Sequence, residues 1–145
     1  MFQGTQSIWI SQNRKTVYEV AQSYPTFVRF FSSKSRIIDQ NASRTYVEVH
    51  TNLLGIYPSV WQGEGIKKPY DEIDFTQTQG LFQGLKAIWS FRDKDGGTEV
   101  SILTTFSKPK LGPFLEQILG KYLVEATTRK ILSELRFQSE KKTDA

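Results

Sequence analysis

The sequence contains no cysteine, one methionine and one histidine. The lack of cysteine excludes disulfides, thiolate nucleophiles and cysteine-ligated metals. No run of about 18 apolar residues occurs, so no helix is predicted to span a membrane. The first thirteen residues, MFQGTQSIWISQN, lack the basic start and apolar run of a signal peptide. We therefore expect a cytoplasmic protein that touches membranes, if at all, only peripherally.

Groups that usually carry catalysis or hold metals are also scarce. The single histidine, His50, alternates with Val47 and Val49 and shares a face with Tyr46 and Glu48, so it is expected on the solvent face. One histidine without cysteine does not favour a transition-metal site. No nucleophile elbow, phosphate-binding glycine loop or paired-carboxylate motif occurs. The sequence thus predicts no catalytic residue, no metal and no cofactor.

What is present is enough for one ordinary core. The chain has 145 residues, 13% of them aromatic, and no linker or repeat divides it. We expect a single domain over 1–145, with an ordered core over 7–137 and a frayed polar tail over 138–145. The net charge is +4, but basic and acidic residues are mixed along the chain. Such a pattern is typical of a solvated surface rather than of a nucleic-acid interface.

The order of predicted elements indicates an α+β fold. A short strand at 5–11 is followed by a helix from Arg14 to about Gln22, with Asn13 as its N-cap, and by a second short helix at 26–31. Six strands follow in turn, at 35–40, 44–54, 56–66, 71–79, 85–93 and 98–107. Short links between them favour an antiparallel meander, and Pro58 suggests an edge or a bulge in the fourth strand. A helix from about Pro113 to Phe137 ends the chain.

The apolar faces indicate how these parts pack. One face of the strand at 85–93 carries Leu85, Ala87, Trp89 and Phe91, and its partner carries Val100, Ile102 and Phe106. A strongly curved antiparallel sheet of about seven strands, with the long helix in its concave face, would cover both faces.

The long helix has two apolar stripes rather than one. The first stripe holds Leu111, Leu115, Ile118, Leu119, Tyr122, Leu123 and Ala126, and the second holds Val124, Thr128, Ile131 and Leu135. Either the helix bends or breaks near Gly120, or its first half turns an apolar side away from the sheet. In the second case the segment could act as a lid or lie on a membrane. The candidates for that role are Lys108, Lys110, Phe114, Leu115, Ile118 and Lys121.

Three segments together resemble a known family. They are VYEVAQSYPTFVRFF, GLFQGLKAIWSF and GTEVSILTTF followed by LGPFLEQILGKYLVEATTRKILSELR. Their order and spacing over 7–137 resemble the polyketide cyclase/dehydrase family of the START-like (Bet v 1-like, SRPBCC) superfamily. Within it, the sequence is most similar to coenzyme Q-binding proteins and to ribosome-association toxins. The resemblance implies a helix-grip fold with a cavity for hydrophobic molecules between the sheet and the long helix.

The favoured function is binding or carrying a hydrophobic small molecule, such as a lipid, a polyprenyl quinone or a polyketide-like compound. A polyketide aromatase/cyclase or dehydratase, and a protein that binds the ribosome or RNA, are the alternatives, the last disfavoured by the mixed charges. The residues expected to line the pocket are Val49, Leu53, Phe75, Trp89, Phe91, Ile102, Phe106, Leu119, Leu123 and Thr127. The candidates for polar groups in the pocket or at its rim are Tyr57, Trp61, Gln77 and Tyr122.

Overall fold

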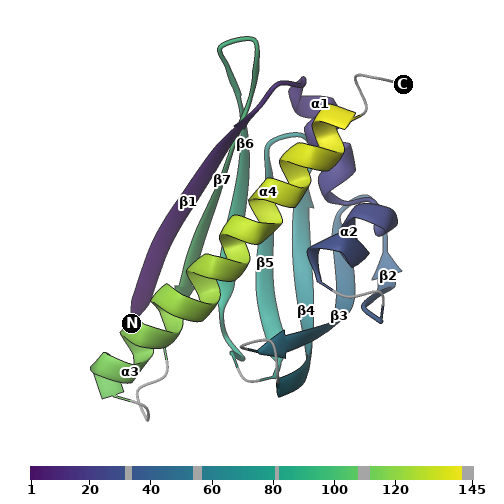
Figure 1. Cartoon of the computed structure of the whole chain (residues 1–145). Coiled ribbons are helices and arrows are strands. Elements are labelled where there is room, and N and C mark those ends of the chain that lie inside the picture. Colours follow the sequence, from purple (N-terminus) through teal and green to yellow (C-terminus); the bar gives the residue numbers. More distant parts are fainter. Residues whose placement is uncertain (32–33, 54–56, 81, 108–111, 142–145) are drawn as a thin grey trace.

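A seven-stranded antiparallel sheet curves around one long helix. The computed structural model describes residues 1–31, 34–53, 57–80, 82–107 and 112–141, and gives only the backbone of residues 24, 25, 28, 52–53 and 57–58. The strand order is β1-β7-β6-β5-β4-β3-β2, and every neighbouring pair is antiparallel. The C-terminal helix crosses the concave side of this sheet (Figure 1). The predicted α+β helix-grip architecture is confirmed.

The strands lie close to where alternation and turn residues predicted them. Their bounds are β1 Phe2–Ile10, β2 Arg36–Gln40, β3 Arg44–Leu53, β4 Tyr57–Lys68, β5 Glu72–Gln79, β6 Lys86–Lys94 and β7 Gly97–Phe106. The first strand begins earlier than expected because all nine of its residues pair with β7, from Phe2 opposite Phe106 to Ile10 opposite Thr98. The fourth strand lies inside the sheet, but its pairing with β5 begins only at Gln62. Pro58 therefore sits where β4 has β3 beside it and has not yet met β5, which suits a residue without an N–H donor.

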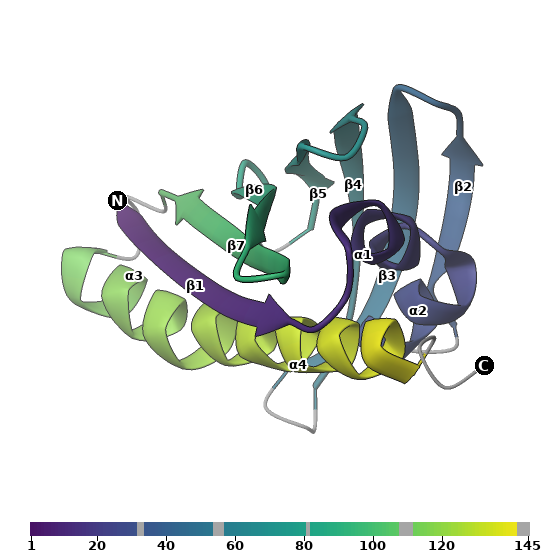
Figure 2. The same ribbon diagram turned by 90° about the horizontal axis from the view of Figure 1, so that it is seen from above.

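Two short helices follow β1 and close one end of the fold. Helix α1 spans Arg14–Ala21 and α2 spans Tyr24–Phe30. Asn13 caps α1 as predicted, because its Oδ1 accepts a hydrogen bond of 2.9 Å from the Thr16 N–H. Seen from above, α1 and α2 lie beside the C-terminal part of the long helix, with α2 next to β2 (Figure 2).

The long helix is continuous but contains a π-helical turn. It consists of α3 (Gly112–Leu119), the turn η2 (Gly120–Val124) and α4 (Glu125–Lys141). It continues past Phe137, and Ser139 is fully buried. The expected fraying from residue 138 is thus wrong for residues 138–141.

The π-turn explains the two apolar stripes. A π-turn inserts one residue into the helical repeat and so rotates everything after it by about 100° relative to what precedes it. The second stripe, Val124, Thr128, Ile131 and Leu135, is buried against the sheet and α1. In the first stripe, Leu115 and Tyr122 are exposed. Both alternatives raised by the sequence therefore hold in part, because the helix changes phase at Gly120 and its first half carries apolar side chains outward.

The core is divided into two clusters. The larger one joins β1, α1, β6, β7 and α4 through residues such as Ile10, Tyr18, Phe91, Val100 and Leu135. The smaller one joins Phe2, Phe106 and Val124, with Phe82, Leu85 and Leu119 packed against it. Side chains of the two clusters leave a space between the sheet and the helix. This space is the candidate site.

Candidate functional site

A cavity of about 260 Å³ lies between the concave face of the sheet and the C-terminal helix. This volume is close to the lower end of the range for small-molecule pockets, about 300–1,000 Å³. Members of both core clusters form parts of its wall, including Ile102 and Ile131 from the larger and Phe82 and Val124 from the smaller. The cavity is therefore a space that both packed clusters border. Its exposed lining is mostly apolar.

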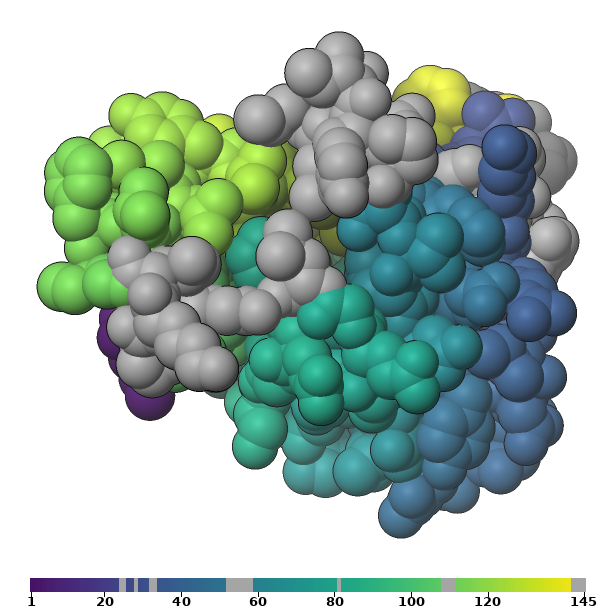
Figure 3. Space-filling model, turned by 90° about the horizontal axis from the view of Figure 1, so that it is seen from below, coloured from purple at the N-terminus to yellow at the C-terminus, as the bar shows by residue number. Residues whose placement is uncertain are grey.

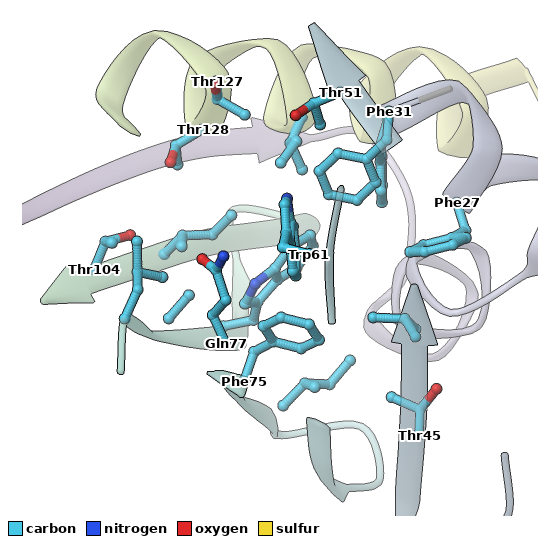
Figure 4. A pocket seen from close by; sticks show the side chains of 18 of the residues that line it. Phe27, Phe31, Thr45, Thr51, Trp61, Phe75, Gln77, Thr104, Thr127 and Thr128 are labelled. Atoms are coloured by element: carbon cyan, nitrogen blue, oxygen red, sulfur yellow. The ribbon is translucent and has the colours of Figure 1, made fainter. Parts of the chain in front are cut away.

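Aromatic rings form a connected wall along the cavity. Phe27 meets Phe31 edge to face, Phe31 meets Trp61, and Trp61 meets Phe75, with ring centroids 5.5, 5.8 and 5.8 Å apart. Figure 4 shows Trp61 and Phe75 near the centre of the view and Phe27 and Phe31 to one side. Rings in this arrangement offer both edges and faces to a guest, so the wall favours a ligand with planar or unsaturated parts.

Two glycines of β4 make room for this wall. Gly63 and Gly65 stand on the cavity face of β4, in phase with Trp61. A Cβ at Gly63 would lie 2.3 Å from Cζ of Phe75, and one at Gly65 would lie 2.9 Å from Cγ2 of Thr45. The pairing of β4 with β5 shifts register between Gln62 and Gly63. The glycines are needed because the Phe75 ring lies directly against the β4 backbone.

A few polar groups interrupt the apolar lining. Gln77 is buried, since only 4% of it is exposed, and its Nε2 donates to the Gln79 carbonyl at 3.3 Å. Thr104 of β7 and Thr127 and Thr128 of the helix face the same space (Figure 4). The Thr128 hydroxyl already donates to the Val124 carbonyl at 2.8 Å. Among the described residues, the Trp61 and Trp89 indole N–H groups donate to no partner, so both are available to a ligand.

Lys67 is a charged cavity residue that sequence reasoning missed. Lys67 and Lys68 form a compact basic pair in the sequence, but only 7% of Lys67 is exposed and it lines the cavity. Desolvation by burial lowers the pKa of Lys67, whereas a hydrogen bond from Lys68 to Glu72 raises the pKa of Lys68. The alternation Trp61, Gly63, Gly65, Lys67 was the available signal, because these four residues share one face of β4.

The structure places half of the predicted pocket residues on the cavity wall. Those lining it are Phe75, Trp89, Ile102, Leu123 and Thr127, together with Trp61 and Gln77 from the polar set. Their contact with a ligand remains a prediction. The side chains of Leu53 and Tyr57 lie outside the described part of the chain.

The other predicted residues whose side chains are described do not line this cavity, so their contact with a ligand stays a prediction that the geometry does not support. Val49 and Phe91 are buried, Phe91 within the larger core cluster, and Phe106 and Leu119 pack in the smaller one. Each faces inward as alternation predicted, but neighbouring side chains cover it instead of open space. Tyr122 is 64% exposed, because the π-turn directs it away from the sheet.

The proposed lid or membrane segment is only partly described. Lys108 and Lys110 lie outside the described residues. Phe114 and Leu115 are 76% and 49% exposed, Lys121 is exposed and Ile118 is half-buried. The light-green residues of α3 and η2 form a protruding end of the molecule in the view from below (Figure 3). A membrane or lid role for this end remains a prediction.

The described residues hold no group of three or more potential acidic, histidine or cysteine metal ligands. His50 points away from the cavity, as alternation predicted, with its Nε2 3.2 Å from Glu48 Oε2. Within the same residues, no helix is long and apolar enough to cross a bilayer. The cavity, which combines an apolar lining with a few polar groups, is therefore the candidate functional site.

Comparison with known proteins assigns the family. A family model described as "Polyketide cyclase / dehydrase and lipid transport" matches residues 10–130. The chain belongs to this family. The predicted membership of the START-like superfamily is thereby confirmed, while the coenzyme Q-binding subtype remains a prediction. No curated protein matches the sequence significantly.

Solved structures share the fold of this family member at low sequence identity. The protein TTHA0849 from Thermus thermophilus superposes with a TM-score of 0.82 at 17% identity, over 95% of this chain and 97% of that one. The Zhui aromatase/cyclase from Streptomyces sp. R1128 gives 0.83 at 14%, over 98% and 95%. The di-domain aromatase/cyclase StfQ of the steffimycin pathway gives 0.83 at 13%, over 99% of this chain and 52% of that one. At these identities the likeness establishes the fold alone.

Proposed function

We propose that this protein binds and carries a hydrophobic small molecule with planar or unsaturated parts in the cavity under its C-terminal helix. The observation that carries the proposal is the cavity itself, about 260 Å³ of mostly apolar lining in the middle of the fold. A ligand in this cavity gains dispersion contacts with the rings of Phe31, Trp61 and Phe75.

The cavity volume favours a compact guest. A lipid or quinone with a long polyprenyl chain is larger than this cavity of about 260 Å³, so it would fit only with its tail outside. A fused-ring or short-chain compound fits more completely. The cargo we favour is therefore polyketide-like or aromatic, and the long-tailed quinone is the less favoured of the predicted ligands.

Aromatase, cyclase or dehydratase activity is the second candidate. The family description and the fold shared with Zhui and StfQ support it, as do the indole groups of Trp61 and Trp89 and the amide of Gln77 on the wall. Catalysis of this kind needs a proton donor or acceptor beside the reacting atoms. Within the described residues the cavity offers Lys67 as its one titratable lining side chain and no carboxylate. The carrier function therefore ranks first.

Extraction of the native protein tests the proposal. The protein would be purified from its own host without detergent, extracted with organic solvent and analysed by mass spectrometry. We expect one apolar compound in near-stoichiometric amount. The Ala87→Phe variant, which places a ring into the cavity wall, should lose that compound, and Ala126→Phe, at an exposed helix position, should keep it.

The same experiment separates the alternatives. A compound that the protein returns unchanged after incubation supports a carrier, and one that it converts into a cyclised or dehydrated product supports an enzyme. An empty extract together with ribosome binding in the same lysate would contradict both. It would favour the interaction protein that the sequence left open.

A further inference from the structure

Among the described residues that line the cavity, Lys67 is the one with a charged side chain. It lies near the C-terminal end of β4, opposite Ile73 of β5, and both residues line the cavity. Only 7% of the residue is exposed. Its backbone N–H donates to the Ser43 carbonyl at 2.8 Å, so it is the side chain, and not this N–H, that can interact with a ligand in the cavity.

The ammonium group has fewer partners than it can use. Its Nζ donates to the Asn41 carbonyl at 3.1 Å, and an ammonium has three donors. No carboxylate of the described residues forms an ion pair with it, although the neighbouring Lys68 has two, Glu72 at 3.1 Å and Asp74 at 3.8 Å. A buried charge without a counter-charge is costly. Burial indeed lowers the pKa of this amine.

A structural role alone accounts poorly for this arrangement. One hydrogen bond to a turn carbonyl could be made by a neutral side chain or by water, at no cost in buried charge. The neighbouring wall is apolar, with Ile73 and Phe75 following on β5. The wall around Lys67 is therefore apolar, and its ammonium group has N–H donors that the hydrogen bond to Asn41 does not use.

We propose that Lys67 binds an anionic oxygen of the ligand, so that the cavity selects apolar molecules bearing a carboxylate over their neutral analogues. The inference rests on the proposed function, since it assigns a ligand class to the same cavity. The carboxylate would supply the missing counter-charge and accept the free N–H groups. The apolar part of the ligand would lie along the Trp61–Phe75 wall.

A matched pair of probes tests the selection. The probes are 2-naphthoate and the neutral 2-naphthalenemethanol, which share one ring system and differ in charge. Isothermal titration at neutral pH would measure both against the native chain, Lys67→Met and Lys68→Met. Lys68 is the control, since it is the next residue, has the same formal charge and its side chain is 60% exposed.

The native chain should bind naphthoate more tightly than the alcohol by about tenfold or more, the size of one charge-assisted hydrogen bond. Lys67→Met should lose that preference while binding the alcohol about as well as before. Lys68→Met should behave like the native chain.

The inference would be overturned by a native preference for the alcohol, by an equal loss of both probes in Lys67→Met, or by an equal loss of naphthoate in both variants. The comparison of 2-naphthoate with 2-naphthalenemethanol on the native chain tests the charge preference even if Lys67→Met does not fold. Binding of the alcohol without charge preference would overturn this inference alone. Binding of neither probe to the native chain would count against the proposed function as well.

Discussion

The ring of Phe75 lies directly over Gly63, so closely that a Cβ at residue 63 would come within 2.3 Å of Cζ of the ring. The two residues belong to adjacent strands, β4 and β5, and both face the concave side of the sheet. Phe75 in turn meets Trp61 edge to face. The shape of the cavity therefore depends on a residue that has no side chain.

The first prediction concerns this contact. Gly63→Ala should push the Phe75 ring toward the cavity and weaken binding of 2-naphthalenemethanol. The loss of stability should be about 1 kcal/mol, at the low end for overpacking, because a ring edge can move. Urea denaturation and calorimetric titration would measure the two effects. The double variant Gly63→Ala/Phe75→Leu should recover stability; if the two changes are simply additive, the contact does not matter.

The second prediction concerns the π-turn. An alanine normally stabilises a helix relative to glycine by about 1 kcal/mol. Gly120→Ala should do the reverse and destabilise the protein by about 1–3 kcal/mol, because its Cβ would lie 2.1 Å from Cδ2 of Phe2. Denaturation curves would measure this, with Lys121→Ala in the same turn as the exposed control. A Gly120→Ala protein as stable as the native chain would show that β1 and the helix are not held this closely.

The third prediction concerns Tyr18 and alkaline pH. Tyr18 is 1% exposed, and its hydroxyl has no hydrogen-bond partner among the described residues. Burial, with a smaller contribution from Tyr70, raises the pKa of Tyr18 above its ordinary value of 10.0. The unfolded chain therefore loses this proton first, and the folded state loses stability as pH rises above about 10.

Tyr18→Phe should be as stable as the native chain at pH 7 or more stable by about 1 kcal/mol, because it removes an unsatisfied hydroxyl. Its advantage should grow as pH rises through about 10. Urea denaturation at neutral pH and at two alkaline values on either side of about pH 10 would show the trend. A variant that is less stable at every pH would mean that the hydroxyl does have a partner in the folded protein.

The fourth prediction concerns the protruding end of the long helix. If α3 docks on membranes, Phe114→Ser/Leu115→Ser should reduce sedimentation with vesicles of phosphatidylcholine and phosphatidylglycerol several-fold. The stability of the protein should change by about 0.5 kcal/mol or less, because both side chains are exposed. Phe137→Ser, at an exposed position in α4, serves as the control. Native protein that stays in the supernatant would exclude this role.

The fold was predictable because its signals are local. Alternation placed the strands to within a few residues, and Asn13 marked the start of α1. The two stripes on one helix indicated either a bend or break near Gly120 or an apolar side turned away from the sheet. The π-turn itself was not predictable from local signals, and the Phe2 ring of β1, which lies where a side chain at Gly120 would be, is more than one hundred residues away in the chain. The continuation to Lys141 was missed because a polar sequence such as QSEKK does not show that Ser139 is buried by tertiary packing.

The site was only half predictable for a related reason. Alternation tells which side chains face inward, and Phe91 and Trp89 are equivalent by that test. Whether an inward side chain meets another side chain or open space depends on contacts between distant elements. Lys67 was not among the predicted pocket residues, because a charged side chain usually faces solvent, although its phase with Trp61 pointed to the cavity.

The most direct test of the central claim is to locate a bound probe by NMR. Methyl-labelled protein would be saturated with 2-naphthalenemethanol, and intermolecular nuclear Overhauser effects would be recorded. We predict contacts with methyl groups of the cavity wall, those of Ile102, Thr104 and Leu123. Contacts confined to exposed groups such as Leu115 and Val60 would contradict the claim and show that the cavity does not admit the probe.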